Sequence, residues 1–215
     1  MAEEVHPFVD SRDILQNGEV LRRRMQEDGY LFMRGLFDRE LVKGLRTQML
    51  GIAAKHGFVD TTRPLEEAVA NMSAACIEPE PEYTGALQEM YKLEALHGLK
   101  HEPRVQALFE RLLGRTGFPH PMQVVRNVFP QSEYATPAHK DYVHVQGIAE
   151  TYTFWMPLCD CPMDMGGVVI AGETIAIETS PVTGLSDLEK ERCLRLEELF
   201  EKLGVGVSLK EAVTV

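Results

Sequence analysis

The sequence predicts a mainly β core flanked by helices, because two kinds of hydrophobic pattern occupy different parts of the chain. Apolar side chains recur at helical spacing over much of residues 1–117. After Gly117, short segments rich in β-branched and aromatic residues are bounded by Pro, Gly and Asp. We therefore expect a single domain with a mainly helical part (1–117), a β core (118–180) and a C-terminal helical segment (181–215).

Helical periodicity and end signals place the predicted helices of the first part. They lie at residues 17–28, from the capping residue Asp38 to His56, near 85–98, and near 103–113 with Gly114 as the C-terminal cap. A short strand is expected at Tyr30–Met33, directly after Gly29. The first part should thus be a layer of helices with little sheet.

Four segments of the second part have the composition of strands. They are Gln123–Phe129, Thr151–Leu158, Gly167–Ala171 and Thr174–Glu178. The sequence Ser-Asp-Leu-Glu at 186–189 is a capping box, and it predicts that a last helix follows the strands. The β core should therefore end before residue 181.

The charge of the chain excludes some classes of partner. The formal net charge is -11, so a nucleic-acid backbone or an anionic membrane would repel this surface. No apolar run reaches the roughly 20 residues of a spanning helix, and the acidic start does not resemble a signal peptide. We expect a cytoplasmic protein that acts on a small molecule.

The four cysteines, Cys76, Cys159, Cys161 and Cys193, are sparse. The one close pair has a single intervening residue, unlike the two-residue spacing of zinc knuckles, so free thiols are predicted.

One short motif carries the chemical signal. His139 and Asp141 are two residues apart, so in an extended segment both side chains project from the same face. An imidazole and a carboxylate are two-thirds of the facial triad of non-haem iron, which leaves open positions on the metal. His144 is an odd number of residues from both, and on a strand it would face away. So short a motif also occurs in ordinary surface strands, so His139 and Asp141 are candidate metal ligands at this point.

The surroundings of this motif resemble a known family. The stretch from Arg126 through TPAHKDYVHVQG to ETYTFWMPLCDCPMDMGG resembles the core of the phytanoyl-CoA dioxygenase-like proteins. There a prolyl turn leads into His-x-Asp, and a Thr/Trp-rich strand ends in a Pro-Leu turn before Gly-Gly. The N-terminal EDGYLFMRGLFDRELVKGLR resembles the opening of the same family, so the resemblance covers residues 20–172.

This resemblance implies a double-stranded β-helix, or jelly roll, wrapped by N-terminal helices. It also implies Fe(II) and 2-oxoglutarate as cosubstrate, with hydroxylation of an unactivated C–H bond of a small organic substrate. Trp155 and Thr153 would then line the cosubstrate pocket, although Trp155 is equally explained as a core aromatic. Arg126 is a candidate partner of an acidic cosubstrate, with a surface ion pair as the alternative.

The family pattern does not continue after the Gly-Gly turn. Glu173-Thr174 stands where Ser-His would be anticipated, and no histidine follows His144. Arg192 and Arg195 fall in the predicted last helix, so neither is a clear cosubstrate anchor. The third metal ligand is therefore not identified; the carboxylates of Glu173, Glu178 and Asp187 are weak candidates.

Two consequences follow from this departure. A site with one imidazole and one carboxylate binds iron weakly, so the alternative to a dioxygenase is a truncated or diverged family member that acts as a binding or regulatory protein. A closed jelly roll has about eight strands, and fewer are legible here, so an exposed sheet edge must be covered. We favour a homodimer as one way to cover it.

Overall fold

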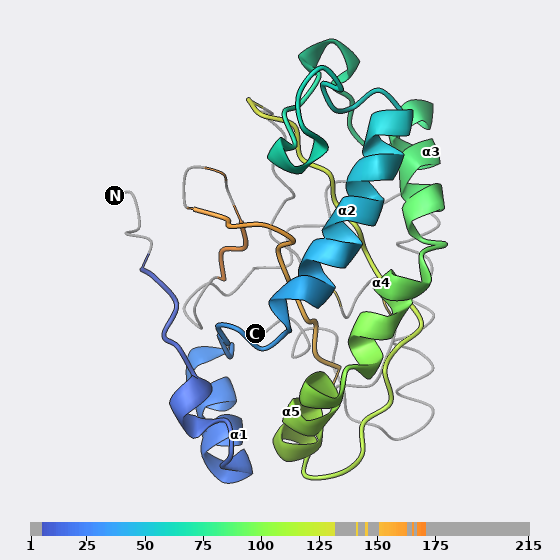
Figure 1. Ribbon diagram of the computed structural model, residues 1–215. Coiled ribbons are helices and arrows are strands. Elements are labelled where there is room, and N and C mark those ends of the chain that lie inside the picture. Colours follow the sequence, from blue (N-terminus) through green and yellow to red (C-terminus); the bar gives the residue numbers. More distant parts are fainter. Residues whose placement is uncertain are drawn as a thin grey trace, which may run out of the picture. The chain divides into compact units, whose positions relative to one another are not determined.

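The computed structural model describes residues 6–131, 141, 145, 151–162, 165 and 167–170 (Figure 1). The chain divides into two compact units. The first is formed by Met1–Gln26, Leu31–Ala135 and Met156–Gly167, and the second by Glu27–Tyr30, Thr136–Trp155 and Val168–Val215. The predicted strand Thr174–Glu178 and the predicted last helix lie outside the described residues.

Three predicted helices are confirmed, namely α1 (Gly18–Asp28), α2 (Arg39–Lys55) and α5 (Pro103–Leu113). Gly114 ends α5 in the left-handed conformation, as its cap position predicts. Short 3-10 helices occur at Arg12–Ile14, Leu65–Glu67, Met72–Ala74 and Leu99–His101. None of the helices within the described ranges is long and apolar enough to cross a membrane.

The single helix predicted near 85–98 is wrong, because the structure has two helices there. They are α3 (Pro81–Met90) and α4 (Glu94–Gly98). Pro81 lies in the first turn of α3, where its missing N–H costs nothing, so the helix begins earlier than predicted. The break follows Tyr91, whose carbonyl oxygen accepts a hydrogen bond from His97 Nε2 at 2.7 Å. This side-chain bond takes the place of a helical backbone bond.

Helix α2 is fixed at its start by the predicted cap. The Asp38 carboxylate accepts hydrogen bonds from the backbone N–H groups of Glu40 (2.8 Å) and Leu41 (3.3 Å). The face that carries Leu45, Met49 and Ala53 is buried. Helix α2 therefore presents one apolar stripe to the core.

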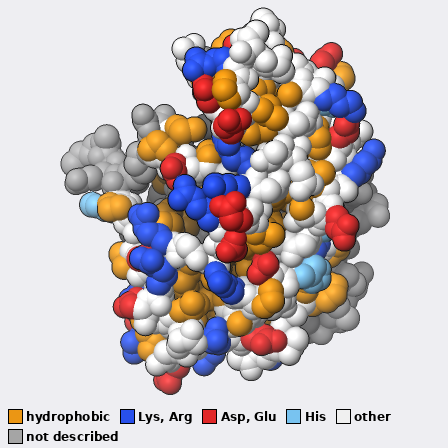
Figure 2. Space-filling view, in the orientation of Figure 1, with side chains coloured by type: hydrophobic (Ala, Val, Ile, Leu, Met, Phe, Trp, Pro, Cys, Tyr) orange, Lys and Arg blue, Asp and Glu red, His pale blue; other side chains and the backbone are white. Residues whose placement is uncertain are grey.

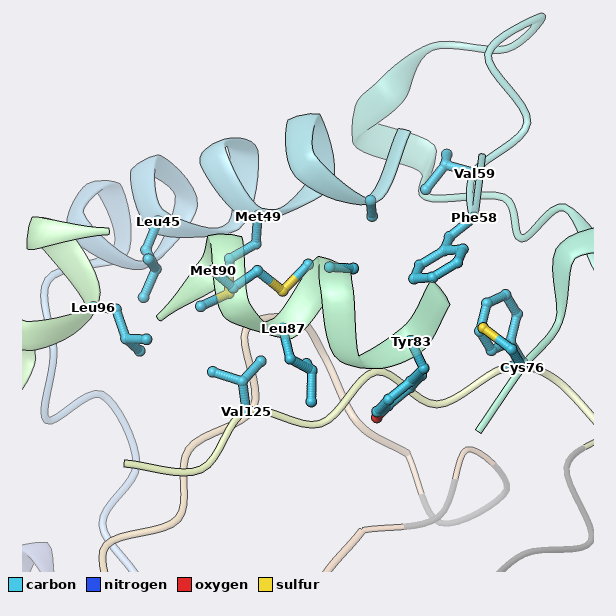
Figure 3. Close-up of a cluster of buried hydrophobic side chains, with 13 residues drawn as sticks. Leu45, Met49, Phe58, Val59, Cys76, Tyr83, Leu87, Met90, Leu96 and Val125 are labelled. Carbon is cyan, nitrogen blue, oxygen red and sulfur yellow. The ribbon is translucent and has the colours of Figure 1, made fainter. Parts of the chain in front are cut away.

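The main hydrophobic core lies in the first unit, where side chains of α2 meet those of α3 (Figure 3). Leu87 and Met90 of α3 are buried in it together with Leu45 and Met49 of α2. Phe58 and Phe129 pack edge to face, with ring centroids 5.4 Å apart. The core thus joins two helices to segments far apart in the sequence.

The predicted strand Tyr30–Met33 is reduced to one parallel β-bridge between Asp10 and Phe32. A turn at Arg34-Gly35, where Gly35 has φ 64°, ends the extended stretch directly after the bridge. A second isolated bridge, antiparallel, joins Val59 to Ala70. The segments Gln123–Phe129, Thr151–Leu158 and Gly167–Ile170 form no β-ladder with other described residues, so the jelly roll stays a prediction.

Residues 123–129 nevertheless show the alternation of a strand. Val125 and Phe129 are buried, whereas Val124 is 58% exposed and Val128 is 73% exposed. The hydrogen bonds alternate in the same way. The Tyr91 hydroxyl accepts from the Val125 N–H at 3.0 Å, and the Tyr83 hydroxyl bonds both the N–H and the carbonyl oxygen of Asn127, each at 3.0 Å. We call these contacts the tyrosine clamp.

Charged side chains also join α2 to α3. Lys55 Nζ lies 2.7 Å from Glu89 Oε2, and His56 Nε2 lies 3.0 Å from Glu89 Oε1. The hydrogen bond from Lys55, and then that from His56, lowers the pKa of the Glu89 carboxyl below its ordinary value of 4.5. Figure 2 shows basic and acidic side chains next to one another on the face of the molecule that it draws.

The tyrosine clamp predicts a specific loss of stability. In Tyr83→Phe the Asn127 N–H and carbonyl lose their partner, so we expect the free energy of unfolding to fall by about 1–3 kcal/mol. Tyr91→Phe leaves one N–H unpaired and should cost about 1 kcal/mol. Urea unfolding followed by circular dichroism measures both. If Tyr83→Phe leaves the free energy of unfolding unchanged, the clamp does not stabilise this segment.

The Glu89 cluster predicts a pH dependence. A carboxyl whose pKa is lower in the folded state adds stability that is fully present above pH 4.5 and is lost as pH falls through the folded pKa. Glu89→Gln should therefore be less stable than the wild type at neutral pH, and the difference should vanish in acid. The control is Glu110→Gln, on the exposed surface of α5. If Glu89→Gln is less stable than the wild type by the same amount in acid, the lowered pKa of Glu89 is not the source of the stability difference.

Candidate metal centre

The structure describes one member of the predicted metal pair. Asp141 is half-buried, and its backbone is helical, as is that of Val145. The extended conformation that we predicted for the motif is therefore wrong at Asp141. His139 lies outside the described residues, so the shared face of the two side chains stays a prediction. Side chains two residues apart share a face in a strand but not in a helix, so the spacing of the motif does not support a shared face at Asp141.

The donor types of the motif fit iron, while their number falls short of a full protein site. Imidazole nitrogen and carboxylate oxygen are the ligand types of the facial triad. Within the ranges that the structure describes, no three His, Cys, Asp or Glu side chains come together to hold a metal. His139 and Asp141 would thus provide two of three protein ligands, and the structure describes no third.

The two predicted pocket residues of the β core are exposed. Thr153 lies on the surface, and the Trp155 side chain is 52% exposed. A role for Thr153 and Trp155 in binding the cosubstrate stays a prediction. The alternative explanation of Trp155, as a core aromatic of the predicted jelly roll, stays a prediction as well.

Arg126 has a partner within the first unit. Its Nη1 lies 2.6 Å from Glu78 Oε2, and both side chains are about half exposed. This is the surface ion pair that we gave as the alternative to a cosubstrate role. Burial raises the pKa of the Tyr83 hydroxyl above its ordinary value. The positive charge of Arg126, which lies near the tyrosine clamp, offsets part of this rise. The guanidinium therefore already has a structural role.

The remaining described histidines have structural roles where their contacts are known. His56 caps the end of α2 beside Glu89, His97 bonds the Tyr91 carbonyl, and His120 Nδ1 accepts from the Met122 N–H at 3.1 Å. Cys76 and Cys159 are free thiols, as predicted, and Cys193 lies outside the described residues.

A surface hollow of about 580 Å³, which no sequence pattern predicted, lies beside the end of α2. Asp60, Asn71 and Ser73 contribute to its lining. Their polar atoms already bond neighbours: Asp60 accepts from Thr62, which lowers the pKa of the Asp60 carboxyl, and Asn71 accepts from Ser73. None of the predicted site residues lines this hollow, and its side chains stabilise local turns.

Comparison with known proteins identifies the class. The family profile described as phytanoyl-CoA dioxygenase (PhyH) matches residues 25–173, a range that includes Arg126, His139, Asp141 and Trp155. The chain belongs to the phytanoyl-CoA dioxygenase (PhyH) family. No solved structure matches the chain.

Two curated relatives share the name 1-deoxypentalenic acid 11-beta-hydroxylase. The protein from Streptomyces exfoliatus is 27% identical over 177 residues, and that from Streptomyces arenae is 27% identical over 179 residues. Each match covers 80% of this chain and 59% of the relative. The chain thus spans about three-fifths of the length of these hydroxylases.

The Arg126–Glu78 pair allows a matched test. Arg126→Gln and Glu78→Gln each break the same exposed ion pair, so both should lower the free energy of unfolding by less than about 1 kcal/mol. We expect equal 2-oxoglutarate affinities for the two variants in anaerobic titrations with iron. A selective loss of 2-oxoglutarate affinity in Arg126→Gln would instead assign the guanidinium to the cosubstrate.

Proposed function

We propose that this protein is a non-haem Fe(II)/2-oxoglutarate-dependent dioxygenase that hydroxylates a small organic substrate. The observation that supports it is the family match over residues 25–173, which contains the His139-Lys140-Asp141 motif. The hydroxylase names of both relatives agree with the reaction class. A jelly roll over residues 118–180, with a second copy covering its open edge, is the scaffold that we propose for this chemistry.

His139 and Asp141 would hold the metal, and the pair is suited to it. A neutral imidazole and a carboxylate bind one side of an Fe(II) ion and leave other positions for cosubstrate and O2. Bound iron and 2-oxoglutarate would supply the oxidising chemistry. The protein would contribute ligand geometry and a binding surface, to which the exposed indole of Trp155 is a candidate contributor.

A second function is supported by a specific observation. No histidine follows His144 in the 215 residues, and Glu173-Thr174 stands where the family has Ser-His. A site with two protein ligands binds Fe(II) weakly. A family member of this kind could bind a small molecule or regulate a partner without turnover.

Anaerobic iron titration distinguishes the two functions. For a dioxygenase we expect Fe(II) binding that 2-oxoglutarate strengthens, followed by succinate release once O2 is admitted. Absence of binding at about millimolar iron, with or without 2-oxoglutarate, excludes the proposed site and favours the non-catalytic function. The full chain serves in every measurement.

Two histidine variants identify the partner of Asp141. The family motif pairs Asp141 with His139, whereas a helix at Asp141 would pair it with a side chain three or four positions away, where the sequence has His144. We expect His139→Ala to abolish Fe(II) binding and His144→Ala to leave it largely intact, because His139 occupies the family's ligand position. The reverse result would show that the helical pairing is used.

A further inference from the structure

An asparagine–glycine pair stands at the start of helix α1, in the first unit. Asn17 is exposed and caps the helix: its Oδ1 accepts a hydrogen bond from the Val20 N–H at 3.2 Å, and its carbonyl oxygen accepts from the Leu21 N–H at 2.9 Å. Gly18 is the first residue of α1. The proposed iron site includes neither residue of this pair.

The packing of α1 against the end of α5 explains why a glycine follows Asn17. A Cβ atom built on Gly18 would lie 2.6 Å from the Arg111 carbonyl oxygen, closer than side chains approach a backbone oxygen. That carbonyl is in the last turn of α5 and lacks a helical partner, so it accepts a hydrogen bond from Arg22 Nη1 at 2.7 Å. The contact between the two helices therefore requires glycine at position 18, and Arg22 helps to hold α1 in place.

An asparagine that precedes a glycine is chemically labile. The backbone nitrogen of the following residue can attack the side-chain Cγ of the asparagine, and glycine hinders this attack least because it has no Cβ atom. The first N–H groups of a helix have no helical acceptor, so the Gly18 nitrogen is open to a base. The nucleophile of the reaction is thus already in place beside Asn17.

The helix cap acts on the other reacting group. The Val20 N–H donates to Asn17 Oδ1, the atom on which negative charge develops when Cγ is attacked, and the positive end of the α1 dipole favours that charge. The docked backbone opposes the reaction. Ring closure between Cγ and the Gly18 nitrogen needs rotation about the Asn17 backbone, and the close contact of Gly18 with Arg111 leaves little room for it.

We propose that Asn17 is a deamidation site whose rate is controlled by the local release of α1 from the end of α5. The Gly18 nitrogen loses its proton to a base and bonds to Asn17 Cγ; the Cγ–Nδ2 bond breaks, and ammonia leaves with one added proton. Water then opens the cyclic imide at either of its carbonyls, which gives aspartate or isoaspartate. Nothing is oxidised or reduced, and water is the co-reactant.

The two products should affect α1 differently. Aspartate keeps a side-chain oxygen at the cap and places a negative charge at the helix start, where it is favoured. Isoaspartate lengthens the backbone and moves the cap away from the Val20 N–H, so it should loosen the start of α1. The modification is independent of the proposed dioxygenase function.

Peptide mapping by mass spectrometry follows the reaction in the full chain during incubation in mildly alkaline buffer. The other asparagines of the sequence, Asn71 and Asn127, are internal references, because each precedes a residue with a side chain. Both also lie in segments that bond to the core of the first unit. We expect conversion at Asn17 to be at least about tenfold faster than at either reference. The rate at Asn17 should rise with pH, since the Gly18 nitrogen must lose its proton.

Two arginine variants test whether the contact with α5 controls the rate. Arg22→Gln removes the hydrogen bond to the Arg111 carbonyl, so the rate at Asn17 should rise by about threefold or more, as expected for the loss of one hydrogen bond from a charged group. Arg23→Gln makes the same charge change at an exposed neighbour and should leave the rate unchanged.

Three results would overturn the proposal. They are conversion at Asn17 no faster than at the two reference asparagines, equal rates at Asn17 in the two arginine variants, and an equal rise at all three asparagines in Arg22→Gln, which would indicate global unfolding instead of local release. Circular dichroism confirms that each variant is folded.

Discussion

The packing of the first unit depends on the hydrogen bonds that the backbone N–H and carbonyl groups of residues 123–129 make on the side that faces the core. Val125 and Phe129 are buried in the core, and the hydrogen bonds of the Val125 and Asn127 backbone N–H groups are partly buried. Unpaired groups there would each cost on the order of 1–3 kcal/mol. Two tyrosine hydroxyls, from Tyr83 in α3 and Tyr91 directly after it, provide the bonds that a neighbouring strand would provide in a sheet. Helix α3 and the residue directly after it therefore provide both apolar contacts and hydrogen bonds to this segment.

On the other lateral side of this segment, the described residues form no β-ladder. Backbone groups of successive residues in an extended chain point in opposite lateral directions, so the clamp pairs only every second residue. Large exposed apolar side chains are also more frequent after residue 117 than before it; they are Phe118, Met122, Val124, Val128, Phe154, Trp155, Met165, Val168 and Val169, against Val9, Met72 and Ile77. Exposed apolar side chains of this kind are candidates for burial by further chain segments.

Local signals predicted the elements that local interactions determine. The 3.6-residue period and the Asp38 cap were sufficient for α2, because the cap bonds only residues two and three positions away. The division between α3 and α4 was missed, since it depends on the contact of the His97 ring with the Tyr91 carbonyl, which periodicity does not contain. The tyrosine clamp joins residues 34 and 44 positions apart in the sequence. For Arg126 the sequence allowed two roles, and only the position of Glu78 shows which contact is made.

The candidate site was predicted from the spacing of His139 and Asp141 and from the family motif, and the number of protein ligands in it determines how its iron affinity should behave. In a site with three protein ligands, the protein holds the metal before the cosubstrate binds. With one imidazole and one carboxylate, a bidentate cosubstrate contributes as many donor atoms as the protein does. By linkage, iron and 2-oxoglutarate must then strengthen each other's binding by the same factor. If His139 and Asp141 are the protein ligands of the iron, that coupling is therefore the quantity that decides between an enzyme and a binding protein.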